Sequence, residues 1–371
     1  MSTPEVVLYG ASGYTGRHVA WKLAERGIPF IAAGRNEERL RHHLAAMPEL
    51  KDARYEVIAV DHDDKALTEL FRGRKVVHNL VGPYMQLGAP VVRAALAAGA
   101  HYLDATGEQD WMIRIRDEYG KAFADRGLVL SPACASMWVS GLLAAEAVLE
   151  KEGIDSLDIL YALHGIPSVS STLSFMRMCC QPQLYLSDKQ LVSWPPANGV
   201  QVCVPGTHQI LTALPWSGGG ESLFFQHDPR VRNCTTLVAF RNQALMNLLV
   251  PKMAEFQQKY AHLSREEQEQ ATNDWAMQIA PRGDVAREDF NQHRVLFTCH
   301  GRGTLVARSI GIWGVTGYVL TGAIGATTID TLLLGRAQAV GFQPATQVVG
   351  VKRLHGELAS EGVFGQTEVL I

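Results

Sequence analysis

Three glycines near the N-terminus have a spacing that suits a phosphate-binding turn. In EVVLYGASGYTG, residues 5–16, an apolar run is followed by Gly10, Gly13 and Gly16. The N-terminus of a helix attracts phosphate, because its N–H groups are unpaired and its dipole end is positive. Gly10 would permit a tight turn, Gly13 close approach of a pyrophosphate, and Gly16 close packing of helix on strand. This GxxGxxG pattern, which differs from GxGxxG, predicts dinucleotide binding rather than an ordinary strand–helix turn.

The end of the second apolar run indicates which dinucleotide is bound. An NAD site favours Asp or Glu at this place, where the carboxylate holds the ribose hydroxyls. This chain has Gly34, Arg35 and Asn36 instead. The guanidinium of Arg35 offers a planar fork for a 2′-phosphate, so the sequence predicts NADP(H). A solvated Arg35 without a ligand is the alternative.

Later strand ends supply further candidates for the ligand crevice, which opens at the carboxyl ends of parallel strands. Asp61 is placed to accept from the adenine amino group, or else to cap the following helix. Gly82 and Pro83 would carry the backbone over the cofactor. Tyr84 would project toward the nicotinamide, and we expect it either to donate the catalytic proton or only to shape the pocket.

Asp104 ends the fifth apolar run and is also expected to contact the cofactor. Glu108 lies at the same edge as a further crevice candidate. Local capping by Asp104, Thr106 or Glu108 is the alternative role.

Strand-like and helix-like segments alternate through the first 150 residues. This alternation predicts a Rossmann-type parallel sheet with helices on both faces. The expected strands are Val6–Tyr9, Phe30–Ala33, Glu56–Val60, Val76–Val81, Tyr102–Ala105 and Leu128–Ser131. The expected helices are His18–Arg26, Glu37–Ala46, Asp64–Phe71, Pro90–Ala98, Trp111–Asp125 and Val139–Glu150.

The alternation ends near residue 151, and the composition changes. Residues 166–226 contain only four charged side chains but many aromatic and Met residues. These residues either line an apolar substrate pocket or build a second core or a dimer interface. Residues 242–260 predict a helix interrupted at Pro251, residues 264–275 predict an acidic surface helix, and Arg294–Cys299 with Thr304–Ile310 predict a hairpin.

Composition excludes several classes of protein. Of the 371 residues, 47% are hydrophobic and 19% charged, which suits two globular domains rather than a disordered chain. The net charge of −3 gives no reason to expect nucleic-acid binding. The six cysteines form no CxxC pair and no zinc-ligand pattern, so we expect no metal and a reduced, cytoplasmic protein.

Two further segments bear on location. The N-terminus enters a strand directly, which makes a signal peptide unexpected. Residues 309–329 carry no charge but contain several glycines and threonines. We expect a buried strand, a turn and a buried helix there, with contact to a membrane surface as the alternative.

Together these motifs resemble the saccharopine dehydrogenase-like NADP-binding family. The matching blocks are GASGYTGR (10–17), AAGRN (32–36), VD (60–61), VGPY (81–84) with Gly88, and HYLDATGE (101–108). The resemblance implies that Ser12, Tyr14, Thr15 and Val81 line the cofactor beside the glycines. It covers residues 1–150 and returns faintly at 317–365.

The resemblance also implies a domain plan. Residues 1–150 would be the NADP-binding domain, residues 151–310 a second, α+β domain for substrate or dimerisation, and residues 311–371 a segment whose helices return to the first domain. Members of this family are often homodimers, so the resemblance implies a homodimer here as well.

Two rival reductase patterns are also present. Tyr185 and Lys189 have the Tyr-x-x-x-Lys spacing of short-chain reductases, in a Pro- and Ser-rich segment that favours a chance match. Cys134 precedes a helix, where a thiolate nucleophile would sit in N-acetylglutamyl-phosphate-type reductases, which share the GASGY start. The Asn-Pro-Gly lead-in of those enzymes is missing, and we therefore expect Cys134 to be near the cofactor instead.

The expected activity is reduction by NADPH of a C=C or C=O bond in a mainly hydrophobic small molecule. The resemblance to a family that includes saccharopine reductases and trans-acting enoyl reductases makes saccharopine-type C–N chemistry on amino acids the alternative within enzymes. An NADP-binding sensor or scaffold without turnover is the alternative outside enzymes.

Overall fold

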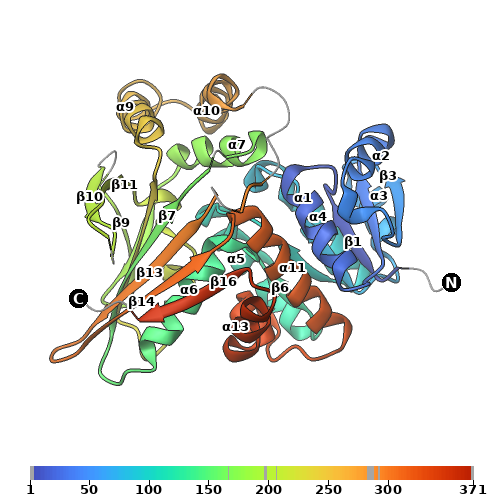
Figure 1. Ribbon diagram of the computed structural model, residues 1–371. Coiled ribbons are helices and arrows are strands. Elements are labelled where there is room, and N and C mark those ends of the chain that lie inside the picture. Colours follow the sequence, from blue (N-terminus) through green and yellow to red (C-terminus); the bar gives the residue numbers. More distant parts are fainter. Residues whose placement is uncertain are drawn as a thin grey trace. The chain divides into compact units, whose positions relative to one another are not determined.

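The computed structural model describes residues 4–165, 167–195, 199–205, 207–281, 288–290 and 293–368, with the backbone alone for Ser217 (Figure 1). Ile166, residues 196–198 and Gly206 of the aromatic-rich stretch lie outside these ranges. The chain forms two compact units. Unit 1 contains residues 1–106, 111–139 and 318–361, and unit 2 contains residues 107–110, 140–317 and 362–371.

A seven-stranded parallel sheet forms the centre of unit 1, with the order β15-β6-β5-β4-β1-β2-β3. Its strands are β1 (Val6–Tyr9), β2 (Phe30–Gly34), β3 (Tyr55–Ala59), β4 (Val76–Asn79), β5 (His101–Asp104), β6 (Val129–Ser131) and β15 (Gly341–Phe342). The predicted Rossmann-type sheet is therefore confirmed. The apolar runs lack clean alternation because both faces of the sheet are covered.

Helices follow each of the first six strands of this sheet (Figure 1). They are α1 (Tyr14–Glu25), α2 (Glu37–Ala45), α3 (Asp64–Phe71), α4 (Tyr84–Ala98), α5 (Gln109–Asp125) and α6 (Ser136–Leu149), with a short 3₁₀ turn, η1 (Pro48–Leu50), after α2. Four helices begin earlier than predicted: α1 at Tyr14, α4 at Tyr84, α5 at Gln109 and α6 at Ser136. In α4 the predicted start at Pro90 lies inside the helix, which accommodates the proline.

One face of the sheet packs against α3, α4 and α5. Val7, Ile31 and Val77 on the strands share a core with side chains such as Leu67 and Val92 on the helices. Every one of these five side chains is fully buried. Burying an aliphatic side chain contributes about 1.5–3 kcal/mol relative to exposure, so this core holds the strand ends in fixed positions.

The C-terminal part of the chain returns to unit 1, as the family resemblance implied. The helix α11 (Gly317–Leu333) approaches α1 so closely that a Cβ on Gly322 would lie 2.6 Å from the carbonyl oxygen of His18. A Cβ on Gly325 would lie 2.8 Å from the ring of His78 on β4. Small residues on α11 therefore allow this close packing. The unit also contains α12 (Ala345–Val349) and α13 (Val351–Ser360).

A mixed seven-stranded sheet forms unit 2, with the order β16-β14-β13-β7-β12-β8-β9. Its strands are β7 (Ser156–Leu163), β8 (Leu184–Ser187), β9 (Gln190–Ser193), β12 (Asn233–Phe240), β13 (Val295–Arg302), β14 (Ala307–Gly314) and β16 (Phe364–Glu368). Only β7 and β12 are parallel; the other neighbours are antiparallel. The predicted hairpin is β13–β14.

The remaining elements of unit 2 surround this sheet. They are α7 (Val169–Arg177), η2 (Met178–Cys180), the two-stranded pair β10 (Val200–Cys203) and β11 (Ile210–Ala213), η3 (Trp216–Gly218), α8 (Glu221–Phe224), α9 (Gln243–Lys259) and α10 (Arg265–Ile279). The helix α9 runs through Pro251 without a break, whereas the sequence predicted an interruption there. The expected boundary after residue 310 falls inside β14, and β16 pairs with that strand.

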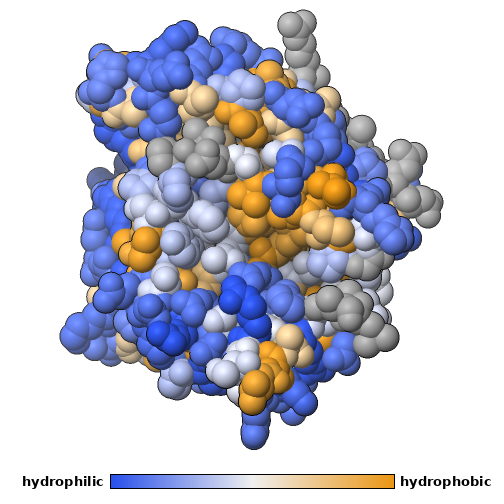
Figure 2. All heavy atoms as spheres, turned by 90° about the vertical axis from the view of Figure 1, so that its left-hand side faces the viewer, coloured by the Kyte–Doolittle hydropathy of each residue, from blue (hydrophilic) through white to orange (hydrophobic). Residues whose placement is uncertain are grey.

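Residues 309–329 form the end of β14, a short connection and most of α11, as predicted. No helix among the described residues is long and apolar enough to cross a membrane. Figure 2 looks at the side on which Figure 1 shows β9, β10 and α9, and apolar side chains gather in one area of it. Exposed apolar residues on these elements include Val192, Val200 and Leu248.

A buried ion-pair group joins several segments of unit 2. Arg177 is fully buried, and its guanidinium contacts Glu108 at 2.9 Å and Asp110 at 2.5 Å. Ser174 donates a further hydrogen bond to Glu108 at 2.8 Å. Because a buried charge must be paired, this group fixes Glu108 in a structural position. Glu108, expected at the crevice, thus has its carboxylate occupied within unit 2.

Candidate functional site

The turn between β1 and α1 requires its glycines for reasons of space. Gly10 has a φ of +93°, and a Cβ on it would lie 2.7 Å from Val81 Cγ2. A Cβ on Gly16 would lie 2.5 Å from the carbonyl oxygen of Gly10, and one on Gly13 would lie 3.2 Å from that same oxygen. The three glycines therefore let the first turn of α1 close directly on the end of β1.

The N-terminus of α1 has no side-chain cap. Gly13 is the N-cap residue, and it has no side chain that could accept from the first N–H groups of the helix. Ser12, Tyr14 and Thr15, which were predicted to line the cofactor, are all partly exposed in this turn. A helix start with this geometry suits a pyrophosphate, which can accept from backbone N–H groups.

Aromatic side chains surround the same turn. The ring of Tyr14 meets that of Tyr318 from α11 edge to face, at 4.8 Å between centroids, and lies 4.8 Å from the ring of His18. Arg17 lies over the Tyr14 ring at 5.5 Å. The role of Tyr318 was missed, because no local pattern connects a residue near the C-terminus with the first helix.

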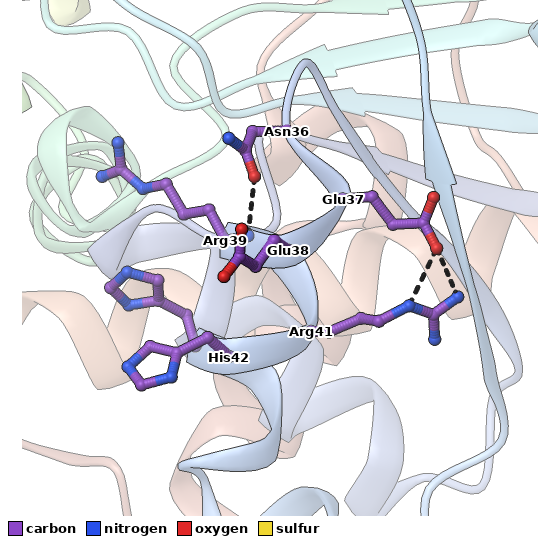
Figure 3. Close-up of a pocket in the computed structure, with 7 residues that line it drawn as sticks. Asn36, Glu37, Glu38, Arg39, Arg41 and His42 are labelled. Carbon is purple, nitrogen blue, oxygen red and sulfur yellow. Dashed lines mark hydrogen bonds and ion pairs between the residues drawn. The ribbon is translucent and has the colours of Figure 1, made fainter.

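Arg35 follows β2 at the same carboxyl edge and is exposed, whereas Gly34 is buried. Asn36 caps α2 by accepting from the backbone N–H of Arg39 at 2.8 Å. Figure 3 shows this cap beside the Glu37–Arg41 ion pair, in a surface hollow of 770 Å³ lined by residues 36–39 and 41–43. Arg35 is therefore available to a phosphate, while the side chain of Asn36 has a structural partner.

The positive charge of Arg35 acts on a partly buried pair, Tyr9 and His62. The Tyr9 hydroxyl lies 2.7 Å from His62 Nδ1, with the two rings stacked at 5.8 Å. Burial raises the pKa of Tyr9 to about 12, although Arg35 opposes the rise. Burial and then Arg35 lower the pKa of His62, so the imidazole is neutral at neutral pH. This pair, which the sequence analysis missed, holds the loop after β3.

Asp61 lies in that loop and is exposed. The cap of α3 is Asp63, which accepts from the N–H groups of Lys65 and Ala66 at 2.9 Å. Asp63, and not Asp61, is therefore the residue that caps α3. Asp61 keeps an available carboxylate at the edge of the sheet.

Val81, Gly82 and Pro83 connect β4 to α4. Val81 and Gly82 are partly exposed and Pro83 is buried as the N-cap residue of α4. Asn79, the last residue of β4, accepts from the N–H of Val81 at 3.1 Å. Tyr84 is the first residue of α4, with 7% of its surface exposed, and it belongs to the core between the sheet and α4.

Asp104 is fully buried and accepts four hydrogen bonds. Its donors are the Tyr102 hydroxyl, Trp111 Nε1, and the N–H groups of Thr106 and Ala133, at 2.8–3.0 Å. Burial raises the pKa of Asp104 to about 6, against the effect of these donors. The carboxylate thus joins β5 to the segment after β6, a tertiary role beyond the local capping that the sequence left open.

Cys134 lies inside unit 1 rather than at an open edge. Its side chain is fully buried, and Sγ lies 3.4 Å from the hydroxyl of Thr328 on α11. Burial raises the pKa of this thiol to about 12. Burial thus disfavours the thiolate that a nucleophile at this position would require.

The Tyr185–Lys189 pattern also lacks the geometry of a short-chain reductase. Tyr185 lies on β8 and Lys189 in the turn before β9, with a φ of +63°. The lysine Nζ donates to the carbonyl oxygens of Asp228 and Pro229. The two residues are not on one helical face, and the match is a chance one.

Four of the eight aromatic and Met residues in 166–226 are buried within unit 2. They are Met176, Met178, Trp216 and Phe225. For these four the packing interpretation holds. Tyr185 and Trp194 remain partly exposed.

Comparison with protein families agrees with this geometry. The model of the saccharopine dehydrogenase NADP binding domain matches residues 6–124. The model of a family of unknown function, DUF5938, matches residues 139–370.

Two relatives match about a third of this chain. A lipid droplet localized protein of Caenorhabditis elegans is 37% identical over 142 residues, which are 36% of this chain and 33% of that protein. A trans-acting enoyl reductase of Mycobacterium bovis is 37% identical over 134 residues, or 35% of this chain and 32% of the enzyme. The matches thus span about a third of these relatives.

One solved structure shares the whole fold. Apo saccharopine dehydrogenase (L-Glu forming) from Saccharomyces cerevisiae aligns with 99% of this chain and 100% of its own, at a TM-score of 0.63 and 13% identity. From these matches, the chain belongs to the DUF5938 family and carries a saccharopine dehydrogenase NADP binding domain at its N-terminus.

Proposed function

We propose that this protein is an NADPH-dependent reductase that transfers hydride to a C=C or C=O bond of a mainly apolar small molecule. The observation that carries the proposal is the edge of the unit 1 sheet, where an uncapped α1 N-terminus and an exposed Arg35 follow neighbouring strands. The similarity of about a third of the chain to an enoyl reductase supports the same activity.

In this proposal, different residues at this edge bind different parts of NADPH. The N–H groups at the start of α1 bind the pyrophosphate, and Gly10 and Gly16 let that turn close on the end of β1. Arg35 binds the 2′-phosphate, and Asp61 accepts from the adenine amino group. Bound NADPH supplies the hydride, so the protein has to orient it and deliver a proton.

In this proposal Tyr84 donates the proton. Its phenol is at the N-terminus of α4, directly after the loop that crosses the cofactor edge. Its small exposed fraction, 7%, is compatible with a donor that meets the substrate from within the wall of the site.

Two features favour an apolar substrate. One relative is named for its location at lipid droplets, and the other for the reduction of enoyl groups. Residues 166–226 have few charged side chains, and the buried Arg177 among them is already paired with carboxylates. A dicarboxylic amino acid would need free cations, because a buried carboxylate must be paired.

The test is the oxidation of NADPH by the purified protein with a panel of enones of rising apolar size and with saccharopine-like amino acids. The proposal expects turnover of enones that increases with apolar size. Faster turnover of the amino acids would establish saccharopine-type chemistry instead. NADPH binding without turnover of any compound would indicate a sensor or scaffold.

The proposal also includes the cellular compartment and the oligomeric state of the protein. The six cysteines are all free, which favours a reducing compartment such as the cytoplasm. The expected homodimer is tested by sedimentation analysis of the purified protein.

A further inference from the structure

A second hollow lies wholly within unit 2. Its volume is 390 Å³, within the range of small-molecule sites. It is bordered by the segment from η2 to β8, the end of β9, and the helices α9 and α10. Its lining includes Cys179, Gln181, Trp194, Met253, Phe256 and Ala261.

Uncharged side chains line this hollow throughout. None of its thirteen lining residues is acidic or basic. Burial raises the pKa of the Cys179 thiol to about 12, so this group is neutral as well. A charged ligand would lose its hydration here without gaining a counter-ion, which is unfavourable. The lining therefore selects for uncharged molecules.

Apolar side chains form much of the wall of this hollow. Phe256 is 2% exposed and packs against the ring of Trp275 at 6.4 Å. The indole of Trp194 is held against Tyr185, at 4.6 Å between ring centroids and 43° between planes. Met253 adds a side chain that adapts to irregular shapes. Such walls suit a ring system or a short hydrocarbon chain.

Two lining residues have buried N–H donors without an acceptor. Gln181 Nε2 and Trp194 Nε1 are shielded from solvent and find no partner among the described residues. The oxygen of the Gln181 amide accepts from the backbone N–H of Asp110 at 3.1 Å, which fixes the orientation of the amide. A buried donor without a partner is costly, so a bound acceptor at this place would be stabilised.

From these observations we propose that the hollow between η2, β9 and α9 is a binding site for an uncharged, mainly apolar molecule that carries a carbonyl-type oxygen. The oxygen would accept from Gln181 or Trp194, and the apolar part would contact Phe256 and Met253. This site does not depend on the proposed reductase function, since its residues and its test involve no cofactor.

Three probes of nearly equal shape test the proposal on the full chain without NADPH. They are 2-acetonaphthone, its hydrocarbon analogue 2-isopropenylnaphthalene, and the anion 2-naphthoate, each measured by isothermal titration calorimetry. We expect the ketone to bind about three- to tenfold more tightly than the hydrocarbon, and at least about tenfold more tightly than the anion. Equal affinities for all three, or no binding of the ketone, would overturn the proposal.

Two variants locate the site. Trp194→Phe removes the N–H but keeps a ring, and should weaken the ketone about three- to tenfold while leaving the hydrocarbon nearly unchanged. Ala261→Trp fills the hollow from its exposed rim and should abolish binding of both. Trp313→Phe, at a 42% exposed position on β14, is the matched control. Unchanged ketone affinity in both Trp194→Phe and Ala261→Trp would refute the site.

Discussion

Trp111 Nε1 donates a hydrogen bond to Asp104 Oδ2 at 2.8 Å, and both side chains are fully buried in unit 1. The same indole fills the space above Gly88, where a Cβ would lie 2.4 Å from Trp111 Cζ2. The tryptophan thus joins the end of β5 to α4. Because α4 begins at Tyr84, the Asp104–Trp111 contact also positions the candidate proton donor.

Replacing Asp104 by Asn should destabilise the protein by roughly 2–4 kcal/mol at pH 7. The amide NH₂ would face donors that now point at a carboxylate oxygen, and those donors would be left unsatisfied. Urea unfolding measures the effect. Asp52→Asn, at an exposed position, is the control and should change stability by less than about 0.5 kcal/mol. Equal midpoints for the two variants would contradict the assigned role.

Arg35→Ala should weaken NADPH binding by roughly ten- to a hundredfold while NADH binding barely changes. A charge-assisted bond to the 2′-phosphate is worth about 1.5–3 kcal/mol, and NADH has no such phosphate. Fluorescence titration with both cofactors tests this. Arg72→Ala removes another exposed arginine, which pairs with Glu69, and should leave both affinities unchanged. An equal loss for the two cofactors would show that Arg35 does not read the phosphate.

Gly16→Ala should cost more than about 2 kcal/mol of stability and abolish tight NADPH binding. The added Cβ would lie 2.5 Å from a backbone oxygen, so the start of α1 would have to move. Gly27→Ala separates crowding from conformational strain, because Gly27 has a φ of +65° but nothing within 4 Å of a Cβ. That control should cost only about 1–2 kcal/mol and spare the cofactor. Thermal melts measure the stability of both variants, and cofactor titration measures their NADPH affinity. Similar losses of stability and affinity in Gly16→Ala and Gly27→Ala would argue against a crowded turn.

Tyr84→Phe should lower kcat by about a hundredfold or more if the phenol donates the proton. The substitution keeps the ring and its packing, so stability should change little. Steady-state kinetics with an enone that the native protein reduces are the measurement. Tyr55→Phe, on β3, is the control for loss of a phenol away from the α4 start. If kcat is unchanged, Tyr84 only shapes the wall of the site.

Glu221 should make the stability of unit 2 depend on pH. It is fully buried, accepts from the hydroxyls of Tyr161 at 2.6 Å and Thr236 at 3.2 Å, and burial raises its pKa to about 7. A raised carboxyl pKa means that the folded state favours the protonated form. Its stabilising contribution is therefore complete below the unfolded pKa near 4.3 and is lost as the pH rises through about 7.

The variant Glu221→Gln isolates this contribution, because the amide stays neutral at every pH. Denaturant midpoints of the native protein should fall between pH 5 and pH 8, whereas those of the variant should change less over the same interval. Glu266→Gln, at an exposed position of α10, serves as the control and should keep the native pH profile. Parallel pH profiles for the native protein and Glu221→Gln would refute the assignment.

Much of unit 1 was predictable from local features of the chain. Short apolar runs between helical patterns identified β1 to β6, because a strand buried on both faces needs a continuous apolar run. The phosphate-binding site was also predictable from local motifs, namely the spacing of Gly10, Gly13 and Gly16 and the arginine after β2. Such a site is built from consecutive residues of one turn. These features gave the fold class and the NADP-binding domain.

Other features depend on residues far apart in the sequence, and only the tertiary structure decided them. β15 extends the sheet beside β6, although its two residues carry no strand pattern of their own. Asp104 became a buried acceptor rather than an open ligand group because Trp111 and the N–H of Ala133 close around it. Cys134 is enclosed beside Thr328 of α11, and burial raises the pKa of its thiol to about 12. The residue type at the end of a strand determines which chemistry a side chain could perform. Whether a ligand can reach that side chain depends on its burial and its hydrogen-bond partners, which arise only when the chain is packed.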